Sequence, residues 1–115
     1  MKKNHILKHS YDFDRIIKHN RPFKYKDYII YIERDNLNDY KFGFSVGKKI
    51  GNAVTRNKVK RQLKSIVDKK NYQNNFNCII IVGNGILNRS YLEMTDNLLY
   101  AFNKINILME EQNEK

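Results

Sequence analysis

Positive charge is concentrated in one segment of this chain of 115 residues. The segment from Lys41 to Lys70 contains ten Lys or Arg side chains and one acid, Asp68, whereas the other 85 residues carry 12 basic and 11 acidic side chains. Because so many like charges repel one another and oppose folding, such a segment is more typical of a binding surface than of a region that only keeps a protein in solution. A polyphosphate backbone is its natural partner, so the sequence predicts nucleic-acid binding.

This segment predicts a short strand, a small loop and then a basic helix over Ala53–Lys69, with Asn52 or Thr55 near its start. At about 100° per residue, one arc of that helix is apolar and should pack on a sheet. The apolar arc contains Val59, Leu63, Ile66 and Val67. The opposite arc faces outward and contains Asn57, Lys58, Lys60, Arg61 and Lys64.

The residues before the basic helix predict a helix and two strands. A helix over Ser10–Lys18, with Ser10 as its N-cap, ends before Pro22. Aromatic and β-branched residues predict one strand over Phe23–Glu33, and alternation predicts a second over Tyr40–Gly47. Turn-forming residues 34–39 separate these strands, so we expect the two strands to form a hairpin.

After the basic helix, the sequence predicts a buried strand over Asn77–Val82 and a last helix. A capping box of Ser90 and Glu93 opens that helix. Its expected apolar face consists of Leu92, Leu98, Leu99, Phe102 and Ile105. The order α-β-β-α-β-α predicts an α+β fold, a two-layer sandwich of helices on a small mixed sheet. We expect one RNA-binding domain over residues 1–109 and a polar tail over 110–115 that need not be ordered.

Composition favours a cytoplasmic protein. The lone cysteine, Cys78, lies in an apolar run and is typical of a reduced core residue, so no disulfide framework is expected. No stretch approaches the roughly 18 apolar residues of a membrane span. A membrane-surface role for the basic helix is disfavoured because the helix lacks Trp and Phe.

The sequence shows no pattern typical of a catalytic site or a bound cofactor. His5 and His9 are four residues apart, but no further ligand stands at matching spacing, so no metal site is expected. No Ser or Cys lies in a nucleophile motif, and both common glycine-rich nucleotide-binding patterns are absent. If the chain belongs to an enzyme, another component should supply the chemistry.

The run from Gly43 to Arg61, GFSVGKKIGNAVTRNKVKR, closely resembles the signature of the bacterial ribonuclease P protein subunit. The resemblance extends to the flanks, where Leu7 and Phe13 precede a tyrosine-bearing strand. It implies a subunit that binds a catalytic RNA and helps it to remove 5′ leaders from precursor tRNA, with Mg²⁺ held by the RNA and no catalytic side chain in the protein. It also implies that the basic helix lies in a left-handed β-α-β crossover.

By resemblance, the catalytic RNA should contact the strand end and the basic helix at Lys48, Lys49, Arg56, Asn57, Lys58, Lys60, Arg61 and Lys64. The resemblance also implies a cleft for the 5′ leader, between the basic helix and the sheet, lined by Phe13, Ile17 and Tyr31. Two positions depart from the family pattern. Gly83 replaces a usual arginine, and Ile17 replaces an aromatic residue that can stack on a base.

Simpler interpretations stay open for several of these residues. Phe13 can serve only as a core anchor of the first helix, and Tyr31 can be an ordinary half-buried strand residue. The basic helix can be a solvated face, although such faces normally mix charges of both signs. A ribosomal-type RNA-binding protein is the alternative function, but such a protein does not need the specific run from Ser45 to Arg61.

Overall fold

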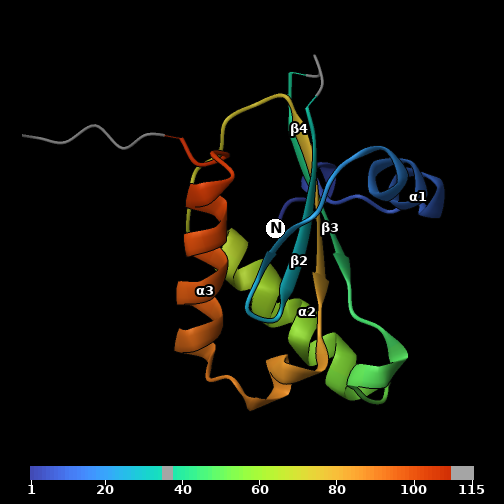
Figure 1. The fold of residues 1–115 in the computed structure, drawn as a ribbon, viewed down its shortest axis with the longest axis vertical. Helices are drawn as coiled ribbons and strands as arrows, with labels where there is room; N and C mark the ends of the chain where they lie inside the picture. The colour runs from blue at the N-terminus through green and yellow to red at the C-terminus, as the bar shows by residue number, and fades with distance from the viewer. Residues whose placement is uncertain (35–37, 110–115) are drawn as a thin grey trace, which may run out of the picture.

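Aromatic and β-branched residues form the centre of a four-stranded mixed sheet (Figure 1). The computed structural model describes residues 1–34 and 38–109. Its strands follow the order β1 (Phe23–Tyr25), β2 (Tyr28–Arg34), β4 (Phe76–Val82) and β3 (Tyr40–Ser45). β2 is antiparallel to β1 and β4, whereas β3 is parallel to β4. The predicted α+β class and mixed sheet are therefore confirmed.

Two predictions about the strands are wrong. The single strand expected over Phe23–Glu33 is interrupted at Lys26, whose φ of 53° lies in the left-handed region, so β1 and β2 form the hairpin themselves. The expected hairpin between that strand and Tyr40–Gly47 does not form, because β4 lies between β2 and β3. β4 takes this position because it is almost entirely buried and apolar, which suits a central strand. The order is therefore α-β-β-β-α-β-α.

The helices agree with the sequence more closely than the strands do. They are α1 (Ser10–His19), α2 (Ala53–Val67) and α3 (Tyr91–Lys104), with three short 3-10 helices η1 (Lys3–His5), η2 (Lys48–Ile50) and η3 (Asn84–Asn88). The Ser90–Glu93 capping box is confirmed. Ser10 is not the N-cap of α1, because His9 takes that position without a side-chain bond. Leu92 is also not on the buried face of α3, since 68% of it is exposed.

Two apolar clusters hold the layers together. α2 and α3 pack on one face of the sheet, where Tyr28, Ile30 and Phe42 belong to the main cluster. α1 packs on the other face, where Ile16 and Ile79 belong to a smaller cluster, so helices cover both faces of the sheet and the expected two-layer arrangement is wrong. Figure 1 shows α1 and α3 on opposite sides of the sheet, with α2 crossing near the end of β3.

The parallel strands β3 and β4 are joined through α2, as the predicted β-α-β unit requires. The left-handedness of this crossover stays an expectation from the resemblance. The predicted tail, 110–115, and residues 35–37 of the predicted turn lie outside the described residues.

Candidate nucleic-acid interface

The outward face of α2 is cationic, as the sequence predicts. Val59, Leu63, Ile66 and Val67 are buried, and these are the apolar residues expected to pack inward. Asn57, Lys58 and Arg61 are exposed, while Arg56, Lys60 and Lys64 are half-buried. Among the described residues, no acidic side chain forms an ion pair with any of these cations. Their charge is therefore available to an anionic partner.

The loop before α2 fixes the start of the helix and presents two further lysines. Ile50 is buried and anchors η2, whereas Lys48 and Lys49 are exposed. Asn52 caps α2 by accepting a hydrogen bond from the Thr55 amide at 3.0 Å. Gly51 has a φ of 157°, and a Cβ atom there would lie 3.0 Å from Thr55. This tight turn places the two lysines beside the first turn of α2.

Arg56 connects this loop to the helix. Its Nε donates a 3.2 Å hydrogen bond to the Gly51 carbonyl, which orients the guanidinium group at the helix start. The other guanidinium nitrogens have no hydrogen-bond partner among the described residues, so they can donate to phosphate oxygens. Lys48, Lys49 and the basic residues of α2 thus lie on two elements that contact each other, η2 and α2.

Phe13, Ile17 and Tyr31 also come together, but not where the sequence analysis places them. All three are half-buried and pack in the smaller cluster, between α1 and the sheet. The expectation that they lie between the basic helix and the sheet is wrong, because the body of α2 packs on the opposite face. The physical reason is the strand period of two, which turns Tyr31 away from its neighbour Ile30 and the main core.

An ion-pair network that the sequence analysis missed holds α1 beside this group. Arg15 on α1 donates to both carboxylate oxygens of Glu33 on β2, at 2.9 and 3.0 Å, and to Asp12 at 2.6 Å. Asn77 on β4 donates to Glu33 at 2.8 Å. These bonds lower the pKa of the Glu33 carboxyl, and the bond from Arg15 is the main cause. Glu33 lies two residues after Tyr31 on the same strand face, but only the fold brings Arg15 to it.

The fold does not bring His5, His9 and Cys78 together. The described residues contain no cluster of three or more His, Cys, Asp or Glu able to hold a metal ion. His5 lies 2.8 Å from the Tyr40 carbonyl and stacks on its ring, whereas His9 stacks on Tyr11, so the two imidazoles have separate surroundings. Cys78 is buried, and burial raises the pKa of its thiol well above the ordinary value. None of the described helices is long and apolar enough to cross a membrane.

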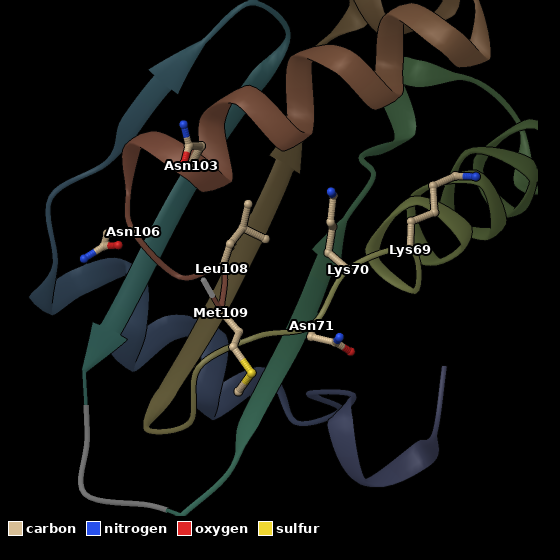
Figure 2. Close-up of a pocket in the computed structure, with 7 residues that line it drawn as sticks. All are labelled: Lys69, Lys70, Asn71, Asn103, Asn106, Leu108 and Met109. Carbon is tan, nitrogen blue, oxygen red and sulfur yellow. The ribbon is translucent and has the colours of Figure 1, made fainter. Parts of the chain in front are cut away.

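A cavity of about 380 Å³ lies where α2 and α3 end, apart from both groups of predicted site residues (Figure 2). Its described lining consists of Lys69, Lys70, Asn71, Asn103, Asn106, Leu108 and Met109. These side chains include no carboxylate, thiol or imidazole that could act as an acid, base or nucleophile. The cavity therefore does not resemble an active site.

Comparisons with known proteins agree with this geometry. The family model described as Ribonuclease P matches residues 1–106. The ribonuclease P protein component of Streptococcus pneumoniae (strain Hungary19A-6) is 34% identical over 115 residues, covering 98% of this chain and 93% of the relative.

Solved structures show the same fold. The Staphylococcus aureus RNase P protein has a TM-score of 0.82 and 25% identity, covering 91% of this chain and 98% of that one. The RNase P protein from Thermotoga maritima has a TM-score of 0.78 at 20% identity, covering 87% and 96%. The chain therefore belongs to the ribonuclease P protein family and is a protein subunit of the endoribonuclease that matures the 5′ ends of tRNA.

Proposed function

We propose that this chain binds the catalytic RNA of ribonuclease P through the outward face of α2 and the loop that precedes it. The observation that carries this proposal is the row of cations on α2 that has no acidic partner among the described residues. The proposed contacts are those expected from the sequence: Lys48, Lys49, Arg56, Asn57, Lys58, Lys60, Arg61 and Lys64. Each phosphate contact releases counterions, so binding should weaken steeply as salt rises.

We assign the 5′ leader of precursor tRNA to the group of Phe13, Ile17 and Tyr31. These three side chains are half-buried: one part of each packs in the smaller cluster, and the rest is exposed and can contact a single strand of RNA. Aromatic rings hold unpaired bases by stacking without strict sequence readout. Ile17 can only pack, so Phe13 and Tyr31 are the two proposed stacking residues.

The RNA carries out the cleavage in this family, and we propose that it also holds the Mg²⁺ ions of the holoenzyme. The protein then contributes by neutralising phosphates and positioning the substrate. Because precursor tRNA is the proposed substrate, we place the chain in the cytoplasm. Gly83 donates its amide to the Asp27 carbonyl at 2.8 Å, and since it has no side chain it cannot supply the contact that an arginine at this position would make with RNA.

The decisive experiment is cleavage of precursor tRNA by a bacterial ribonuclease P RNA at low Mg²⁺, with and without this protein. We expect the protein to restore correct 5′ cleavage. Absence of rescue would overturn the proposal that this chain assists the catalytic RNA through these contacts.

A further inference from the structure

Tyr91 is an exposed aromatic residue at the junction of α2 and α3. It is the first residue of α3, and 37% of it remains exposed. Its hydroxyl lies 2.8 Å from Oγ of Ser65 on α2, and Nζ of Lys69 lies 5.6 Å from its ring centroid. Figure 2 shows the Lys69 side chain pointing away from the other residues that line the cavity. A flat ring is thus held in place beside a cation on the outer surface.

This ring lies at the end of an exposed stripe on α2. Val54, Lys58, Arg61 and Ser65 follow one another at spacings of four, three and four residues, so they share one side of the helix. All four are exposed, and the last of them contacts Tyr91. The stripe contains two of the cations assigned above to the catalytic RNA. An RNA strand that follows it toward the end of α2 reaches Lys69 and Tyr91.

We propose that the RNA-binding surface continues from α2 onto α3, with Tyr91 stacking on an unpaired base of the catalytic RNA and Lys69 contacting a neighbouring phosphate. This inference rests on the function proposed above. The hydrogen bond to Ser65 restrains the ring before binding, which reduces the entropy lost when a base stacks on it. A ring beside a cation is the combination that holds single-stranded nucleic acid.

The surroundings of Tyr91 differ from those of the tyrosines that only support the fold. Tyr28 and Tyr72 are 1% and 4% exposed, and their hydroxyls donate to the backbone carbonyls of Met94 and Val67. Tyr91 instead keeps over a third of its surface exposed, and its hydroxyl partner is an exposed side chain. Its position therefore leaves ring surface for a ligand.

The test compares Tyr91→Leu with Tyr100→Leu in binding to the catalytic RNA over a range of salt concentrations. Tyr100 is a matched control: it lies on the same helix, is 44% exposed, and has Nζ of Lys104 at 5.4 Å from its ring. It faces Tyr25 on β1 rather than α2. We expect Tyr91→Leu to weaken binding roughly tenfold, the effect of one lost stacking contact, and Tyr100→Leu to leave it unchanged.

Salt dependence separates the two parts of the proposal. Tyr91→Leu should keep the wild-type salt slope because it removes no phosphate contact, whereas Lys69→Ala should reduce the slope by about one. Tyr91→Phe should bind almost as well as the wild type, because stacking needs only the ring. Equal affinities of Tyr91→Leu and wild type would overturn the inference.

Arg61→Ala, measured in parallel, distinguishes failure of this inference from failure of the proposed function. If only Arg61→Ala weakens binding to the catalytic RNA, Tyr91 is not a contact but the proposed function stands. If neither Arg61→Ala nor Tyr91→Leu weakens binding, both the Tyr91 contact and the proposed RNA-binding face of α2 are wrong. Photo-crosslinking of the unaltered protein to 4-thiouridine-substituted catalytic RNA gives a readout that does not depend on how a variant folds. Crosslinks to the peptide containing Tyr91 support the inference, and crosslinks confined to other segments overturn it.

Discussion

The ring of Phe13 on α1 lies against Gly43 on β3, so that a Cβ atom at position 43 would come within 2.5 Å of Phe13 Cζ. α1 can approach the sheet this closely only because β3 has no side chain at that position. The same ring is one of the two proposed stacking residues for the 5′ leader. The absence of a side chain at Gly43 thus determines where a proposed binding residue lies.

Gly43→Ala should displace the Phe13 ring from this position. Forcing a methyl group into a packed site costs about 1–3 kcal/mol of folding free energy when the surroundings must move. We expect weaker binding of precursor tRNA with a long leader and unchanged binding of leaderless tRNA, because only the proposed leader contact is disturbed. Holoenzyme affinities for the two substrates provide the measurement.

Gly47→Ala is the control for this variant. A Cβ atom at Gly47 meets nothing within 4 Å, and its φ of −73° suits any residue. Gly47→Ala should therefore leave the holoenzyme's affinities for precursor tRNA with a long leader and for leaderless tRNA at the wild-type level. If Gly43→Ala also kept the wild-type preference for the long leader, Phe13 would be a core residue only, as the simpler interpretation holds.

The helices could be predicted from the sequence because their signals are local. The buried face of α2 and the capping box at Ser90 each depend on residues within a few positions of one another. The order of the strands depends instead on which distant segments pair with one another. β4 takes a central position because it is apolar on both faces. The break at Lys26 was also missed, since a lysine gives no sign of a left-handed backbone.

In the proposed site, too, local features could be predicted from the sequence and long-range contacts could not. The basic surface could be predicted because its residues are nearly contiguous in the sequence. The network at Glu33 could not, because Arg15 and Asn77 are 18 and 44 residues away from it. Tyr91 does not stand out in the sequence, because its contact with Ser65 joins residues that are 26 positions apart.

The combined variant Arg56→Ala and Arg61→Ala should abolish assembly with the catalytic RNA while the fold remains intact. Both side chains are proposed phosphate contacts, so the salt slope of any residual binding should fall by about two. Binding titrations at several salt concentrations and circular dichroism test these two statements. A variant that removes the same charge elsewhere, Lys3→Ala with Lys24→Ala, should bind normally; unchanged affinity of the arginine variant would contradict the proposal.

Asn52→Ala should destabilise the start of α2. Its side chain accepts a hydrogen bond from the Thr55 amide, and loss of such an N-cap costs about 1 kcal/mol of folding free energy. Asn52→Ser keeps an oxygen that can cap the helix, so it should remain close to the wild type. Urea unfolding of the three proteins measures the difference, and equal stability of the two variants would show that the cap contributes little.

Glu33 should make the free energy of unfolding depend on pH in the acidic range. Its bond from Arg15, followed by the bond from Asn77, lowers the pKa of its carboxyl in the folded state below the ordinary value of 4.5. A lowered folded pKa stabilises the protein at pH values above the unfolded pKa, and this contribution is lost as pH falls from about 4.5 through the lower folded value. The free energy of unfolding, measured by urea at a series of pH values, should therefore fall less steeply with decreasing pH for Glu33→Gln than for the wild type.

Arg15→Ala should reduce the same pH-dependent part of the free energy of unfolding, because it removes the main cause of the lowered Glu33 pKa. The double variant Arg15→Ala with Glu33→Gln should then lose no more of the pH-dependent free energy of unfolding than either single variant loses. Losses that add up in the double variant would show that the two residues do not act as a pair.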